Sequence, residues 1–466
     1  MLSQEQDHVM TAEEEKLAKA PVGKLIITYA VPSIISMVVM SIYNMVDQIF
    51  IGNGVGYLGN GATNVCYPIM VAAMAVTMIF AGGGTAFFSL RLGEKKYDQA
   101  RRAIGTSFTI DIILILLLTI GCAVFLEPVC RLFGCTDEIL PYAIEYGTWI
   151  LPGLVPVCVV MTLSGFIRSD GSPRVAMAAM LAGAVFNTAL DPVFIFVLHL
   201  GVKGAAMATT LSEILGFFIV LWYLPRFKTV HLTAKDFIPD FSIFRKIFVL
   251  GLSSFVSQCA MLFLMGLMNN AYVKYGALSK YGSSIPLTAM GITSKFSQVV
   301  FSFANGTMSG AQPIIGYNYG AGNITRVKKT YLTATAINLC FMILGTVIFE
   351  LFPQQAVNLF GSESELYNEF AVKCIRVFMM VLVCSGLQAS ITNLFQSIGK
   401  SMRALLLSSL RQILLLLPAV LILPLFFGLN GVLWASPVAD TTACLISIGF
   451  LIYQWKQLTK EEQLRA

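Results

Sequence analysis

Residues 403–427 read RALLLSSLRQILLLLPAVLILPLFF, an almost unbroken apolar run that is long enough to cross a lipid bilayer as a helix. Similar runs recur along the whole chain, and none shows the period-2 alternation of a membrane β-barrel. We therefore predict an all-α membrane protein with twelve transmembrane helices. Their expected ranges are 24–50, 58–90, 103–126, 140–167, 175–199, 203–224, 244–273, 284–309, 329–351, 368–397, 403–427 and 431–455.

The composition separates this chain from soluble proteins. Only 12% of its 466 residues are charged, whereas soluble proteins usually have about 25%. The formal net charge of +6 could indicate an anionic partner, but Lys and Arg of membrane proteins accumulate on cytoplasmic loops. We therefore expect the lipid bilayer, and no nucleic acid, as the partner of its surface.

The distribution of His and Cys gives no indication of a metal site. The ten cysteines are scattered singly and there are three histidines, whereas metal sites need convergent ligands. Cys130 and Cys135 share one loop and could form a disulfide, although two free thiols are the favoured interpretation. The sequence also has no clustered His/Glu/Asp or Ser/His constellation. We therefore expect no cofactor and no enzymatic activity.

The positions of Lys and Arg predict the orientation of the chain. Residues 1–23 are polar and acidic and lack the layout of a signal peptide, so the first apolar run is expected to start membrane insertion. With the N-terminus inside, Lys and Arg gather on the inner segments, and the outer loops hold only Arg131, Lys203, Lys274 and Lys280. We predict a multi-pass cell-membrane protein with both termini in the cytoplasm.

The two halves of the chain repeat each other. Gly93 and Gly320 are 227 residues apart, and so are Gly201 and Gly428. Each half has six runs, an even number, so both halves enter the membrane in the same direction and form a parallel repeat of two six-helix bundles. The predicted organisation is a cytoplasmic segment at 1–23, an N-lobe at 24–225, a cytoplasmic linker at 226–242, a C-lobe at 243–455 and a cytoplasmic tail at 456–466.

Polar residues interrupt the first run near its outer end. Asn44 lies three residues before Asp47 and four before Gln48, so the three side chains share one helix face. An ionisable group inside a membrane helix costs at least ~2.5–3.5 kcal/mol, so such a group usually has a function. Asp47 could instead mark the outer end of the helix, but residues 49–51 continue the apolar run. We predict that Asn44 and Asp47 belong to an ion-coupling site.

A second polar group occurs in the fifth run. Asn187 and Asp191 are four residues apart and share a helix face. Pro192 has no N–H, so it leaves the carbonyl of Thr188 without its helical partner. A carboxylate, an amide and a spare carbonyl could together hold a proton, a water or a cation. The alternative, a solvated helix end, is disfavoured because apolar residues follow.

The second half has no counterpart of these carboxylates. Asn269 corresponds to Asp47, and Pro418 falls at the offset of Asp191, so we expect the N-lobe alone to handle the coupling ion. The remaining charges inside the runs have no assigned role, and internal ion pairing is the favoured interpretation. They are Asp111, Glu213, Lys295, Arg376, Arg411 and Asp440.

Over essentially its full length, the chain resembles the multidrug and toxic compound extrusion (MATE) family, in its DinF-like branch. The resemblance is carried by residues 32–48, the loop LGEKKYDQARR at 92–102, residues 187–192, GVKGAA at 201–206 and QPIIGYNYGAG at 312–322. It implies two six-helix lobes in a V shape and drug efflux coupled to inward H⁺ or Na⁺. It also implies coupling roles for Asp47, Asn187 and Asp191, a helix-bending role for Pro32 and a supporting role for Thr209, while Pro192 would kink its own helix.

The resulting functional hypothesis is a secondary active multidrug antiporter. It would export organic, often cationic compounds as a monomer, in exchange for H⁺ or Na⁺, by alternating access. The alternative is a lipid-linked saccharide flippase of the related superfamily, which should line its cleft with Arg and Lys to bind phosphates. Lys295, Arg376 and Arg411 are the isolated candidates for such a lining, so the antiporter is favoured.

Overall fold

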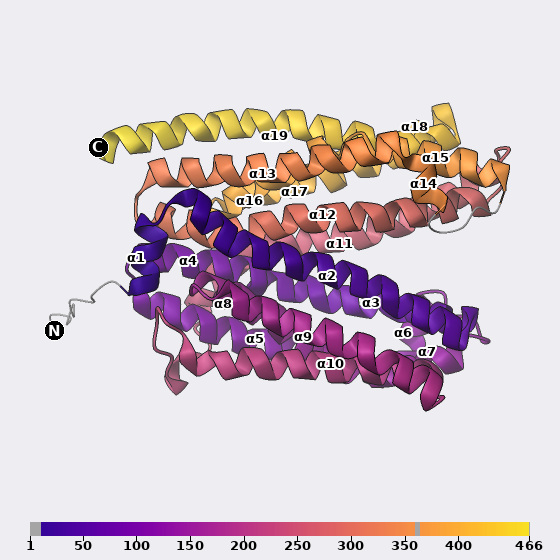
Figure 1. The fold of residues 1–466 in the computed structure, drawn as a ribbon, viewed down its shortest axis with the longest axis horizontal. Helices are drawn as coiled ribbons and strands as arrows, with labels where there is room; N and C mark the ends of the chain where they lie inside the picture. Colours follow the sequence, from indigo (N-terminus) through magenta and orange to yellow (C-terminus); the bar gives the residue numbers. More distant parts are fainter. Residues whose placement is uncertain (1–10, 359–363, 466) are drawn as a thin grey trace.

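The computed structural model describes residues 11–358 and 364–465, and this part of the chain is helical with no strand. Residues 1–10 of the predicted N-terminal segment and residue 466 of the predicted tail lie outside the described residues. Figure 1 shows two bundles side by side, one from each half of the chain. The start of α1 (Ala12–Lys19) and the final turns of α19 (Leu429–Arg465) lie at the same end of the molecule. We call this the terminal end, and the other the opposite end.

The N-lobe consists of the first six membrane-spanning segments, several of which are interrupted. Its elements are α2 (Val22–Val55), α3 (Tyr57–Met78), η1 (Ile79–Gly84), α4 (Thr85–Gly93), α5 (Tyr97–Val124), α6 (Leu126–Leu132), α7 (Leu140–Ile150), η2 (Leu151–Gly153), α8 (Leu154–Ser169), α9 (Pro173–Pro192), η3 (Val193–Val197), α10 (Gly201–Tyr223) and η4 (Leu224–Arg226). A π-helical segment, η3, follows Pro192 directly, at the point where the missing N–H disturbs the helical pattern.

The C-lobe follows a short linker that contains η5 (Ala234–Phe237). Its elements are α11 (Phe241–Ala277), α12 (Ser284–Gly320), α13 (Ile324–Leu351), α14 (Pro353–Asn358), α15 (Glu365–Met379), α16 (Leu382–Ser397), α17 (Ser401–Ser409), η6 (Leu410–Leu416), α18 (Leu417–Phe427) and α19. The two lobes thus confirm the predicted fold class.

Eleven segments of the described chain are long and apolar enough to cross a membrane, and α12 supplies the twelfth at lower hydropathy. Between Gly306 and Asn318, every residue of α12 except Ser309 is buried. This helix packs against α2 and α4 of the N-lobe as well as against α13 of its own lobe. Because it faces protein rather than lipid, it tolerates the small and polar residues that lower its hydropathy.

The lobes are in closest contact in the half near the terminal end. A Cβ atom added at Gly310 of α12 would lie 2.5 Å from Cα of Ala30 on α2. A Cβ atom added at Gly251 of α11 would lie 2.2 Å from the carbonyl oxygen of Ile79 in η1. Small residues therefore allow backbones of opposite lobes to touch, as in many membrane helix pairs. The molecule is closed between its lobes at this end.

Helix α1 was not predicted as a helix, and it contacts both lobes at the terminal end. Thr11 and Glu14 form a capping box that fixes its start. On the C-lobe side, the carbonyl oxygen of Leu17 accepts hydrogen bonds from Asn318 Nδ2 at 3.2 Å and from Arg326 Nε at 3.0 Å. Leu17 itself is 0% exposed. These contacts attach the segment before α2 to α12 and α13.

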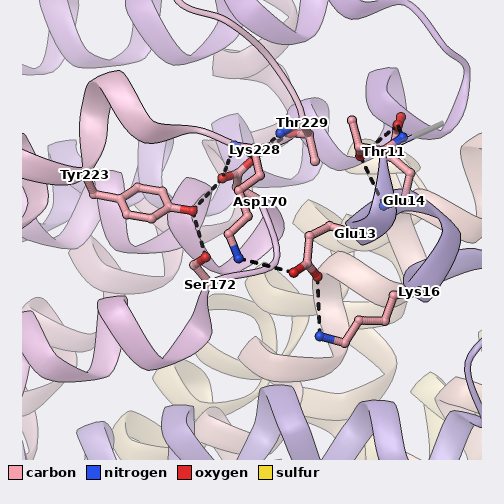
Figure 2. Close-up of polar contacts among 9 residues, drawn as sticks. All are labelled: Thr11, Glu13, Glu14, Lys16, Asp170, Ser172, Tyr223, Lys228 and Thr229. Atoms are coloured by element: carbon pink, nitrogen blue, oxygen red, sulfur yellow. Dashed lines mark hydrogen bonds and ion pairs between the residues drawn. The ribbon is translucent and has the colours of Figure 1, made fainter. Parts of the chain in front are cut away.

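On the N-lobe side, α1 is attached through an acidic side chain. Figure 2 shows Glu13 paired with Lys228 of the linker, at 3.2 Å. The start of the linker is in turn held by Asp170, which accepts hydrogen bonds from Tyr223 Oη at 2.7 Å and from the backbone N–H groups of Lys228 and Thr229, each at 2.8 Å. Burial raises the pKa of Asp170, although these hydrogen bonds oppose the rise.

Candidate functional site

Three helices of the N-lobe bring the predicted coupling residues together. Asp47 comes from α2, Asn187 and Asp191 from α9, and Thr209 from α10. Asp191 is 0% exposed, Asn187 1% and Thr209 4%, so these three side chains are withdrawn from water. Helix α9 packs against both α2 and α10, which explains how residues distant in the sequence meet.

The amide of Asn187 links the carboxyl group of Asp191 to α10. In the orientation that satisfies both of its ends, the Asn187 nitrogen donates to Asp191 Oδ2 at 2.8 Å. Its oxygen accepts from Thr209 Oγ1 at 3.2 Å and from the backbone N of Thr209 at 3.1 Å. Asn187 therefore fixes the position of the Asp191 carboxyl group, as the i,i+4 spacing predicted.

The Asp47 and Asp191 carboxyl groups lie close enough to influence each other. Because a carboxylate only accepts hydrogen bonds, a hydrogen bond between them would require a proton on at least one of the two groups. Within the described residues, Oδ1 of Asp47 is buried and has no hydrogen-bond partner. A buried polar atom without a partner usually indicates a missing water or ion, or a functional strain. The pair can therefore bind a proton or a small cation.

Two tyrosines near this pair were not selected from the sequence. The Tyr43 side chain lies near Thr209, Asp47, Asp191 and Glu213. Tyr146 of α7 is 5% exposed and faces Asp47 and Tyr43. Tyr43 lies four residues before Asp47, so the same helix-face argument could have found it. For Tyr146 the sequence offers no comparable signal, because its contact depends on how α7 packs.

The remaining predicted site residues lie elsewhere. Asn44 is exposed, and its amide donates to the carbonyl of Met40 on its own helix at 2.8 Å, so the structure does not bring it into the cluster. Pro32 is buried inside α2, which continues through it as one helix, and a bending role stays a prediction. Pro192 ends α9 one residue after Asp191, where η3 begins.

The other charges inside the spans differ between the lobes. In the N-lobe, Asp111 is 0% exposed and accepts from Thr162 Oγ1 at 2.6 Å and Thr77 Oγ1 at 3.2 Å. In the C-lobe, the predicted ion pairing is found between Arg411 and Asp440 at 2.6 Å and, more loosely, between Arg376 and Glu350 at 4.0 Å. Within the described residues, Glu213 forms no ion pair at 4.0 Å or less. Cys130 and Cys135 are free thiols.

A family model places the chain among known proteins. The model described as MatE matches residues 32–193 and 259–421, which together are more than half of the chain. The two matches start 227 residues apart, the same offset as the internal repeat. The chain is also 26% identical over 444 residues to the multidrug export protein MepA of Staphylococcus haemolyticus, covering 93% of this chain and 94% of that one. MepA of Staphylococcus aureus NCTC 8325 is 26% identical over 440 residues, with the same coverage.

Solved structures share the fold. An outward-facing conformation of a multidrug resistance MATE family transporter superposes with a TM-score of 0.87, at 24% identity and over 97% of this chain and 100% of that one. A MATE in the straight conformation gives a TM-score of 0.88 at 24% identity over the same shares. A transporter from Pyrococcus furiosus, with a reverse-polarity binding pocket suggesting a different function, gives 0.86 at 24% identity, again over 97% and 100%.

The fold, the repeat and the N-lobe carboxyl pair define a multi-pass helical membrane transporter. The chain belongs to the MatE family, because the family model matches both lobes. At this level of identity the solved structures support the fold, and the substrate has to be argued from the residues.

Proposed function

We propose that this protein is a secondary active multidrug antiporter, which exports organic, often cationic compounds in exchange for H⁺ or Na⁺. The observation that carries the proposal is the Asp47–Asp191 carboxyl pair, enclosed in a lobe whose Lys and Arg side chains lie near the helix ends. A carboxyl pair without a fixed counter-charge can exchange a proton or a cation when the transporter changes state. The names of the two MepA relatives agree with drugs as the cargo.

In the proposed mechanism, ion binding changes the charge of the pair. Neutralising a carboxylate in a low-dielectric lobe removes its demand for a polar partner. Helix α2, which carries Asp47, can then move relative to α9, with Pro32 as the point where a backbone hydrogen bond is already missing. Such a movement would reshape the N-lobe surface that faces the C-lobe and release the drug by alternating access.

The flippase alternative is weakened by the surroundings of the intramembrane cations. Two of the three candidates already have carboxylate neighbours, since Arg411 binds Asp440 at 2.6 Å and Arg376 lies 4.0 Å from Glu350. Cations engaged in this way are poorly placed to bind a diphosphate. The chain has 21 methionines and 33 phenylalanines, and an apolar surface made of such side chains would suit varied drugs better.

The proposed function predicts ion-driven transport of an organic cation. We expect purified protein in liposomes to transport ethidium when a pH gradient is imposed in sodium-free buffer, or when a Na⁺ gradient is imposed at constant pH. Ethidium fluorescence with encapsulated DNA measures the transport, and protein-free liposomes provide the control. Ethidium transport driven by neither gradient would contradict the antiporter. Comparing the two gradients also identifies the coupling ion.

The orientation predicts which loops can be labelled from outside the cell. We propose that the terminal end is cytoplasmic, which follows from the concentration of Lys and Arg there. In a variant without native cysteines, Leu278→Cys, 78% exposed in the loop after α11, should react with an impermeant maleimide on intact cells. Lys95→Cys, between α4 and α5, should react only after lysis. The reverse pattern would refute this orientation.

A further inference from the structure

The C-lobe contains a charge pair that the proposed coupling mechanism does not use. Arg411 of η6 donates from Nε to Asp440 Oδ1 at 2.6 Å and from Nη2 to Oδ2 at 3.2 Å. Ser385 of α16 donates to the same Oδ2 at 2.6 Å. Asp440 is 5% exposed, so its carboxylate is enclosed by the lobe and held by a two-pronged guanidinium contact.

The internal repeat relates this pair to the N-lobe site. Asp440 and Glu213 are 227 residues apart, and Ser436 corresponds in the same way to Thr209. Asp440 therefore lies one helical turn beyond the counterpart of a coupling-site residue. Arg411 lies three residues before Leu414, the counterpart of Asn187. Both members of the pair are thus displaced by about one turn, in the same direction, from the position equivalent to the N-lobe site.

The two lobes treat a buried carboxylate at this level in different ways. The counterpart of Arg411 in the N-lobe is Ala184, which is 4% exposed and carries no charge. The N-lobe carboxyls Asp47 and Asp191 face each other, and only a proton or an external cation can neutralise them. In the C-lobe the neutralising charge is part of the chain.

We infer that the Arg411 guanidinium is a resident cation: it neutralises Asp440 in the C-lobe as an exchangeable ion would neutralise the carboxyl pair of the N-lobe. Asp440 therefore takes no part in the coupling cycle. A tethered guanidinium cannot leave, so the Arg411–Asp440 pair stays neutral in every state of the transporter. This inference rests on the proposed function, because it gives the physical reason why the N-lobe alone would respond to the ion.

The groups around the pair are consistent with this assignment. Within the described residues, Asp440 is the carboxylate that interacts with Arg411. The nearby titratable groups are the thiols of Cys384 and Cys444. The cations of the neighbouring helix α15 are engaged elsewhere, since Lys373 binds Asn430 Oδ1 at 2.7 Å and Arg376 faces Glu350.

The first test removes the resident cation and measures stability against pH. In Arg411→Met, the Asp440 carboxylate loses its partner and becomes stable only when a proton or Na⁺ neutralises it. We expect the melting temperature of the purified full-length variant to lie on the order of 5 °C or more below the parent at pH 8 without Na⁺. It should approach the parent value as the pH falls or Na⁺ is added. The parent should lack this additional dependence.

The second test separates a resident cation from simple packing. In Arg411→Met/Asp440→Leu both charges are replaced by apolar groups, and Ser385 keeps a partner because its hydroxyl also bonds the Val381 carbonyl at 3.2 Å. The double variant should regain the pH profile of the parent and its ratio of ions to drug transported. Lys373→Met, which removes a C-lobe lysine that binds an amide, is the matched control and should change neither.

Two outcomes would overturn the inference. One is a loss of stability in Arg411→Met that is equal at all pH and Na⁺ values, which would assign the arginine to packing alone. The other is a double variant that transports drug with a changed ion ratio, which would place the pair inside the coupling cycle. If the parent transports no drug, the proposed function fails, but the melting comparison still decides whether Arg411 replaces an exchangeable ion.

Discussion

Replacing Asp191 with asparagine should nearly abolish ion-driven drug export while leaving drug binding almost unchanged. Asparagine has the shape of aspartic acid and can still bond Asn187, but it cannot change its charge by binding an ion. Placing a charge inside a membrane helix costs at least ~2.5–3.5 kcal/mol. In the variant the site is always neutral, so the free-energy difference between its charged and neutral forms can no longer drive the change of state. This difference corresponds to about a 100-fold loss of export rate against a gradient.

The measurement is ethidium export from energised cells at matched expression, with binding measured separately on purified protein. Asp47→Asn should behave like Asp191→Asn, because the two carboxyl groups lie next to each other and form one site. Asn187→Ala should lose less, because it orients Asp191 without carrying the ion. Asp137→Asn is the control, since its side chain is 89% exposed in a loop. Parental export by both coupling variants would refute the mechanism, and loss of drug binding would make the aspartates substrate contacts.

Alanine at Gly251 should shift the transporter out of the state that is closed at the terminal end. The added Cβ would lie 2.2 Å from the carbonyl oxygen of Ile79 in the other lobe, and 2.5 Å from its Cα. Both neighbours are backbone atoms, so no side-chain rotation can relieve the clash. Overpacking costs about 1–3 kcal/mol, which corresponds to a roughly 5- to 150-fold change in the equilibrium between closed and open states.

Spin labels at positions 95 and 329, one in each lobe near the terminal end, would measure this shift as a longer distance population. Drug export should fall in parallel, since the closed state is one half of the cycle. Gly266→Ala is the matched control on the same helix, because a Cβ there meets nothing within 4 Å. An unchanged distance distribution in Gly251→Ala would show that the glycine contact does not hold the lobes together.

The sequence was sufficient for the fold class and for most of the residues that meet around Asp47 and Asp191. Apolar length predicted eleven of the spans, α12 being less apolar, and the i,i+4 spacing placed Asn187 beside Asp191. It failed for Asn44, because a helix-face argument says which residues point the same way and not which neighbour they meet. It also missed α1, although Thr11 and Glu14 carry the capping-box pattern, because no apolar run follows them. Tyr146 depends on tertiary packing, which periodicity does not encode.

The attachment of α1 divides α2 into two parts with different freedom to move. Before Pro32, the helix is anchored: α1 fastens its start to the C-lobe, and Leu25, Ile26 and Tyr29 are at most 1% exposed. In the described residues of α2 that follow Ser41, Ile51 alone is buried. A force on the less buried part, which carries Asp47, therefore cannot be relaxed by sliding the whole helix along its axis. Under the proposed mechanism the strain would be taken up between the two parts, so ion binding would move α2 as a hinge rather than as a piston.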